Sequence, residues 1–276
     1  MKWIVKPIPF AAIGVACWMA IGYCVAHAAL QGTPTLQPVE AADWPPFVAI
    51  GGLIVGAIAS VVAVRREVSL AARLILSILG VYLFFRLLPA ETRPAVWARL
   101  ATGFLVWLYW IDLDRLAERV RPAVFWPSIA AASGGLAVSL ALSGSLVLGV
   151  LAAIIACLSA MMMLVSFFAA RFADPAASVP ALAALTTLLA LSGIHFADLL
   201  VGCLALLAIS ASAAWVVALA PGCDRLPLWK QVIITCMIAV GFAAASAFVA
   251  FRAYPIEADS AINAIDRRAI ADDRFA

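Results

Sequence analysis

Long, nearly unbroken apolar runs recur along this chain, and short segments that carry most of the charged residues separate them. A helix that crosses the roughly 30 Å hydrocarbon core of a bilayer needs about 20 apolar residues. Lipid offers no water to unpaired backbone groups, so only helices and closed barrels cross it. These runs are too long for barrel strands, and the sequence therefore predicts an all-α, polytopic transmembrane helical bundle.

The composition excludes several other classes of protein. Of the 276 residues, 66% are hydrophobic and 12% are charged, whereas soluble domains average about 45–50% and about 25%. A water-soluble fold of this length could not bury so much apolar surface, which excludes a soluble enzyme, a disordered chain and a nucleic-acid-binding domain. The six cysteines form no C-x-x-C pair. We therefore expect no disulfide framework, no metal site and no cofactor.

The apolar runs predict about nine spans, within a range of about eight to ten. The stretch from Pro175 to Pro221 is too long for one crossing. We divide it at 192–195, where Ser-Gly-Ile-His is the only turn-like sequence in its middle. If the seventh span is only half a helix, the count is eight. The predicted spans are 8–30, 45–64, 69–88, 95–111, 123–142, 146–169, 177–194, 199–220 and 231–251.

The distribution of positive charge predicts the orientation. With the N-terminus inside, the outer connecting segments hold only Arg93, and all other basic residues of the connections fall inside. Such an inside excess of Lys and Arg is typical of inner-membrane proteins, so we predict an inside N-terminus and an outside C-terminus. The inner group is Lys2, Lys6, Arg65, Arg66, Arg115, Arg119, Arg121, Arg171, Arg225 and Lys230.

The beginning of the chain allows two interpretations. Lys2 and Lys6, an apolar run and then Ala26-His27-Ala28 have the pattern of a cleavable secretory signal. The run is long for a signal, and we prefer an uncleaved first helix that anchors the chain. The chain is rich in alanine and arginine and poor in lysine, which favours a bacterial inner (cytoplasmic) membrane as its location.

We interpret residues 1–254 as a single transmembrane domain. The sequence Leu-Ala-Leu-Ser-Gly occurs at 140–144 and again at 189–193, which raises the hypothesis of a hairpin repeat formed by 123–170 and 177–220. The alternative is that helices of this composition repeat such residues by chance. Small residues also recur at helical spacing, as at Gly52 and Gly56. Such stripes let helices approach closely in lipid.

The polar segment 255–276 is expected on the outer side. Ser260 could cap a short amphipathic helix with Ile262 and Ile265 on one face, and the alternative is a frayed terminus. The bilayer is the expected partner. Other membrane subunits could bind through the small-residue helix faces or this tail, and no nucleic acid is expected.

One group of candidate site residues lies at the outer ends of the spans. His195 and Asp198 are three residues apart and would share a helix face at the start of the eighth span. An Asp beside a His is the pairing that a general base needs. Arg86 and Arg99 could hold an anion such as phosphate or carboxylate. The alternative is a loop His, a capping Asp and arginines that extend toward water.

A second group follows the fourth span. Asp112 and Asp114 could bind a divalent cation together with a lipid-linked diphosphate. The alternative is a salt-bridged helix end, because acids and arginines alternate there up to Arg121.

These observations leave three functional hypotheses. The first is a structural or accessory subunit of a membrane complex, without catalytic activity. The second is a permease or flippase for a small or lipidic solute, and the third is an enzyme with a site at the outer surface. Deep in the spans the polar side chains are hydroxyls, without Asp, Glu, Lys or His. Proton relays usually need ionisable groups there, so a proton-coupled carrier is disfavoured.

Overall fold

A computed structural model describes residues 9–32, 43–61, 66–88 and 93–272, and this part of the chain is helical throughout apart from its turns. The prediction of an all-α fold is confirmed. The α-helices are α1 (Pro9–Gln31), α2 (Pro45–Val61), α3 (Arg66–Leu87), α4 (Val96–Arg119), α5 (Pro122–Leu142), α6 (Leu146–Phe168), α7 (Val179–Phe196), α8 (Val201–Ala211), α9 (Trp215–Leu219) and α10 (Leu228–Asp272), with 3-10 turns η3 (Ala170–Phe172), η4 (Ser212–Ala214) and η5 (Cys223–Arg225).

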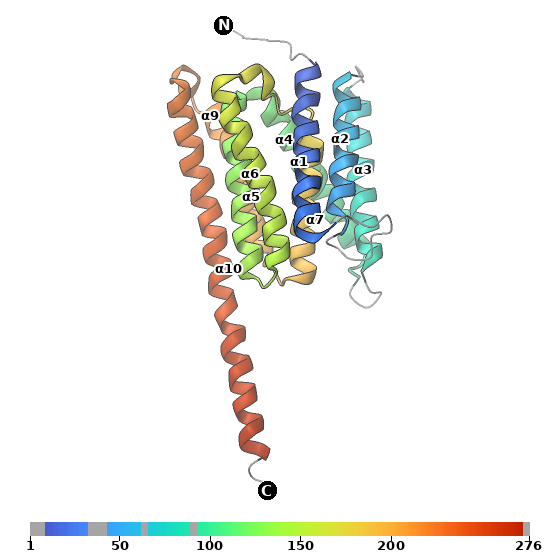
Figure 1. Ribbon diagram of the computed structural model, residues 1–276, viewed down its shortest axis with the longest axis vertical. Helices are drawn as coiled ribbons and strands as arrows, with labels where there is room; N and C mark the ends of the chain where they lie inside the picture. Colours follow the sequence, from blue (N-terminus) through green and yellow to red (C-terminus); the bar gives the residue numbers. More distant parts are fainter. Residues whose placement is uncertain (1–8, 33–42, 62–65, 89–92, 273–276) are drawn as a thin grey trace.

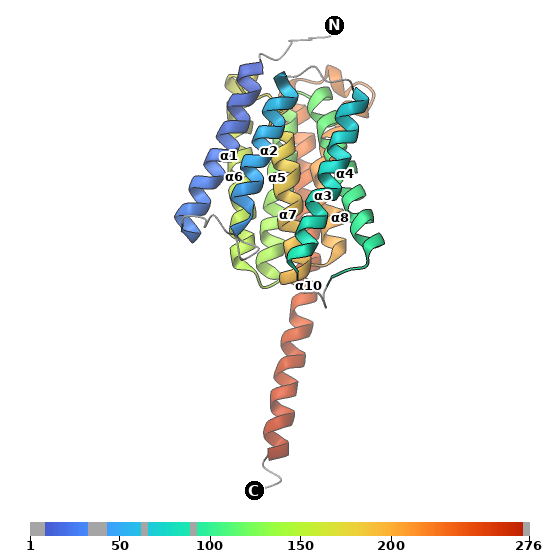
Figure 2. The ribbon, with the colours of Figure 1, turned by 90° about the vertical axis from the view of Figure 1, so that its right-hand side faces the viewer.

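The helices run alternately in opposite directions along the long axis of the molecule (Figures 1 and 2). We call the end at which α1 begins the upper end, because it lies at the top of Figure 1, and the opposite end the lower end. α8, η4 and α9 follow one another as a single bent pass. α3 begins and α4 ends at the upper end, so the basic segments at Arg66 and at Arg119 share one flank.

Among the residues that the structure describes, six helical segments are long and apolar enough to cross a membrane, which supports an integral membrane protein with several spans. α2 contributes a shorter apolar segment, Pro45–Ile58. α3 and α4 are not among the six, and both carry several charged residues. The six segments are Ile13–Gln31, Pro122–Leu142, Leu146–Phe168, Val179–Phe196, Val201–Leu219 and Leu228–Ala253.

The division of the long apolar stretch is misplaced in our prediction. We placed the turn at 192–195, but these residues belong to α7, and the chain turns at 197–200. A Cβ added to Gly193 would meet the Leu140 side chain, so this glycine permits close packing of α7 on α5. The Gly193 carbonyl accepts from the N–H groups of Ala197 and Leu199, both at 3.0 Å, and thereby ends the helix.

α5 lies at the centre of the main core and packs against α6, α8 and α10. Phe125 and Trp126 are completely buried, and the Trp126 indole donates to the Ala173 carbonyl at 2.8 Å. A Cβ on Gly135 would lie 2.7 Å from Leu207 and 2.8 Å from Ala243. Small residues therefore bring α5, α8 and α10 into close contact, as expected where lipid provides no hydrophobic force between helices.

The same principle holds α2 against α7. A Cβ on Gly52 would collide with the backbone of Ala181, and one on Gly56 would collide with the carbonyl of Ala177. The small residues at these two positions therefore serve packing within the bundle.

Buried hydroxyl groups link the helices in the interior. The Ser139 and Ser246 hydroxyls lie 2.9 Å apart and join α5 to α10. The Ser210 hydroxyl donates to the Ala239 carbonyl at 2.8 Å and joins α8 to α10. His27, in the last turns of α1, is also buried.

α10 is far longer than the other helices. It contains 45 residues, which corresponds to about 68 Å at about 1.5 Å per residue. Its second half leaves the bundle at the lower end and stands apart from the other helices in both views (Figures 1 and 2). Most of the expected tail, up to Asp272, therefore continues the last helix of the bundle.

Candidate functional site

His195 lies in the last turn of α7, where it packs against α3. Its ring is 5.3 Å from that of Phe85, edge to face, and 6.0 Å from that of Phe84. Val81, Leu88 and Leu191 complete a small apolar cluster with these two phenylalanines. His195 therefore contacts two aromatic rings of α3, and its ring helps to join α3 to α7.

Asp198 does not share a helix face with His195, contrary to our prediction. It lies in the turn between α7 and α8, with a φ of 48° in the left-handed region, and α8 begins only at Val201. Asp tolerates this conformation better than most residues. The pair was expected at the start of one helix because the turn was predicted at 192–195, five residues before the turn at 197–200.

The arginines of the α3–α4 connection lie near the lower end. Arg93 donates from Nε to the Leu88 carbonyl at 2.7 Å and from Nη2 to the Arg86 carbonyl at 2.8 Å. It thereby satisfies carbonyls at the end of α3, which have no partner within the helix. Arg99 donates from Nε to the Pro94 carbonyl at 2.8 Å. The Arg86 side chain is exposed.

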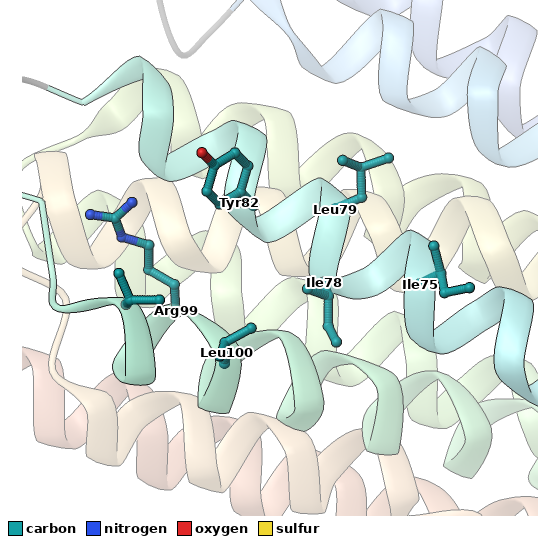
Figure 3. Close-up of a pocket in the computed structure, with 7 residues that line it drawn as sticks. Ile75, Ile78, Leu79, Tyr82, Arg99 and Leu100 are labelled. Atoms are coloured by element: carbon teal, nitrogen blue, oxygen red, sulfur yellow. The ribbon is translucent and has the colours of Figure 1, made fainter.

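A groove with a volume of about 290 Å³ runs between α3 and α4. Figure 3 shows Tyr82 and Arg99 toward one end of it, with Ile75 toward the other end. His195 and Arg86 do not line this groove, so the candidate residues of this flank do not surround one pocket. The lining residues are Ile75, Ile78, Leu79, Tyr82, Val96, Arg99 and Leu100.

Asp112, near the upper end of α4, is held by the bent pass formed by α8, η4 and α9. Its two carboxylate oxygens accept from the Ser212 hydroxyl and from the Trp215 indole N–H, each at 2.7 Å. The guanidinium of Arg119 lies 5.2 Å from the centre of the Trp215 ring, within the range of a cation–π contact. Asp112 therefore fastens α4 to η4 and α9.

Asp114 is directed to a different neighbour. It forms an ion pair with Arg73 of α3, and the Arg73 guanidinium lies 5.8 Å from the centre of the Trp110 ring. Burial raises the pKa of the Asp114 carboxyl to about 7, and the nearby Arg73 limits this rise. The ion pair thus joins α3 to α4 beside an aromatic ring.

The two carboxylates therefore act on opposite sides of α4. Residues two apart on a helix are separated by about 200°, so Asp112 contacts α9 and Asp114 contacts α3. In the described ranges no group of three or more His, Cys, Asp or Glu residues gathers in a way that could hold a metal ion. Asp112 and Asp114 therefore do not face the common site for a cation and a diphosphate that our hypothesis requires. Each carboxylate instead links α4 to a neighbouring helix.

Sequence reasoning missed the partners of both carboxylates. Arg73, Ser212 and Trp215 are distant from α4 in sequence, so helical spacing could not reveal these contacts. The sequence did contain one signal for the Arg73–Asp114 contact. Arg73 lies inside an apolar run, and a basic residue there requires an acidic partner or water.

The chain matches no protein-family model, and searches of curated proteins and of solved structures likewise find no match.

Proposed function

We propose that this protein is a structural or accessory subunit of a membrane complex, without catalytic activity, seated in the bilayer by nine helical passes. The observation that carries the proposal is the projection of α10 beyond the bundle (Figures 1 and 2). After Ala253 the helix continues for about 28 Å. It thus reaches well past the membrane-spanning part of the chain.

A projecting helix of this kind needs a partner. Isolated helices of about 12–15 residues are marginal in water, and most helical stability in proteins comes from packing of one apolar face. Ile262, Ile265 and Ala269 share one helical face by their spacing, and acids and arginines surround them in the sequence. We propose that this face packs against a helix of another subunit on the outer side of the membrane.

The packing of the bundle favours a static role. The Ser139–Ser246 contact and the close approach at Gly135 hold α5 against α8 and α10. The contacts of Asp112 hold α4 against α9. A permease or flippase needs helices that move past one another around its solute. An outer-surface enzyme built on His195 and Asp198 has less support, because His195 packs against two phenylalanines.

The proposed topology has its N-terminus in the cytoplasm and its C-terminus outside, in a bacterial inner membrane. The alternating helix directions and the basic residues of the inner connections support it. Fusions to alkaline phosphatase test it, since this enzyme is active only outside. Activity is expected after Ser145 and after Asp272 but not after Arg121, and the opposite pattern would reverse the orientation.

Photo-crosslinking in membranes of the organism of origin tests the function. A photoreactive phenylalanine analogue at Ile262 should give a discrete adduct with another protein, and the matched position Ala264, on the opposite face, should not. The proposal fails if Ile262 yields no protein adduct and the chain extracted in native-lipid particles is a monomer.

A further inference from the structure

The groove between α3 and α4 is lined by apolar side chains along most of its length and by Tyr82 and Arg99 toward one end, which matches the apolar tail and polar headgroup of a phospholipid. Its walls are apolar side chains, of which Ile75 and Leu79 remain exposed. Along α3 the lining extends from Ile75 to Tyr82, about 10 Å at about 1.5 Å per residue. The two lining residues with polar side chains, Tyr82 and Arg99, lie toward the end nearest the α3–α4 connection (Figure 3).

The charge at this end is positive. Arg86, Arg93 and Arg99 lie on or beside the connection, whereas Glu91 is the only acid in the sequence from 86 to 99. Within the described part of the chain, no carboxylate forms an ion pair with any of these three arginines. The Pro94 carbonyl occupies Nε of Arg99, and the two terminal nitrogens of a guanidinium can still donate to an anion.

The depth of the arginine also fits a lipid headgroup. Arg99 lies one turn into α4, and Tyr82 lies about 8 Å before the end of α3, at about 1.5 Å per residue. This is where amphipathic side chains meet the headgroup region of a bilayer. Guanidinium groups bind phosphate through paired hydrogen bonds.

From this arrangement we infer that the groove binds one anionic phospholipid, with its phosphate at Arg99 and one acyl chain between α3 and α4. An acyl chain gains little by leaving other lipid tails for an apolar groove, because both are equally apolar. The headgroup therefore determines the selectivity. Phosphatidylcholine and phosphatidylglycerol both carry a phosphate, but only phosphatidylcholine also carries a positive choline, which the arginines of this end repel. Arg99, which lines the groove, is the arginine that we expect to contact the headgroup. The groove would hold this lipid whether or not the chain is a subunit of a complex.

Native mass spectrometry of the full chain with a one-to-one mixture of phosphatidylglycerol and phosphatidylcholine tests the inference. The wild-type chain should retain one phosphatidylglycerol in about tenfold preference over phosphatidylcholine, because only the phosphatidylglycerol headgroup has a net negative charge beside these arginines. Arg99→Gln should abolish the preference. Arg252→Gln is the matched control, because Arg252 is an exposed arginine that contacts Phe248 on α10, and it should leave the preference unchanged.

A second variant tests the groove itself. Leu79→Trp narrows the groove on an exposed face, so the fold should survive, and retention of both lipids should fall. The inference is overturned if Arg99→Gln keeps the wild-type preference, or if Arg252→Gln loses it equally, because general surface charge would then explain the binding. Unchanged retention in Leu79→Trp would also overturn it.

Discussion

Two acids of α4, Asp112 and Glu118, do not belong to the ion pair with Arg73. Of these two, removal of the Asp112 carboxylate should destabilise the bundle more. The carboxylate accepts from Ser212 and from Trp215 at 2.7 Å each. A hydrogen bond to a charged group contributes about 1.5–3 kcal/mol, and the half-exposed position of Asp112 reduces this. We expect Asp112→Ala to lower the free energy of unfolding by about 3 kcal/mol.

The loss should be measurable as a shift in Tm. A chain of this size loses about 2–4 °C per kcal/mol, so Tm should fall by about 6–12 °C in detergent. Asp112→Asn keeps one acceptor oxygen, and its effect should be about half as large. The matched control is Glu118→Ala, an exposed acid on the same helix, for which we expect a change within about 0.5 kcal/mol.

A double-mutant cycle with Trp215→Phe isolates the hydrogen bond to the indole. Because the two groups are in contact, the cycle should give a coupling energy of at least about 1 kcal/mol. If Asp112→Ala unfolds at the wild-type temperature, or if the two substitutions are additive, Asp112 does not fasten α4 to α9 and the reasoning fails.

Three further predictions follow from the packing, from the Asp114 carboxyl and from the projecting part of α10. Gly56→Ala should lower Tm, because a Cβ there meets the Ala177 carbonyl. In the control Gly80→Ala a Cβ meets open space, so Tm should stay unchanged or rise. Equal effects of the two substitutions on Tm would contradict the packing argument. Because the pKa of Asp114 rises from 3.8 to about 7 on folding, the folded state binds the extra proton. Stability should then fall as pH rises from about 4 to about 7 and stay constant above, and Asp114→Asn should remove this slope in unfolding experiments across that range. Deletion of 254–276 should leave Tm unchanged but abolish co-purification of the proposed partner, and a large drop in Tm would show instead that the projection supports the bundle.

The sequence predicted the elements of the fold well, because hydrophobic length is a local property. Each predicted span corresponds to a helix or, for 199–220, to the bent pass of α8, η4 and α9. The helix end near Gly193 was misplaced, because a glycine that permits close packing has the same sequence signature as one in a turn. The Leu140 side chain, which lies against Gly193 in the fold, distinguishes the two cases, and it is distant in sequence.

The candidate residues were predicted less well, since their chemistry depends on contacts between helices. Asp112 and Asp114 look like a pair in sequence, but helical geometry directs them to Trp215 and to Arg73. His195 was expected beside a carboxylate and instead packs against Phe84 and Phe85. The prediction that Arg86 and Arg99 bind an anion is not tested. We now propose a phospholipid phosphate as the anion at Arg99.

The ion pair between Arg73 and Asp114 has a consequence for biosynthesis. A lone Arg or Asp in a membrane helix makes insertion by the translocon less favourable, by about 2.5–3.5 kcal/mol at the helix centre and by less near an end, where the side chain can extend toward water. α3 and α4 carry such groups near one flank, and each neutralises the other only when both helices are present. We therefore expect the two helices to leave the translocon together as a hairpin, so that a ribosome stalled after α3 alone would leave that segment poorly integrated.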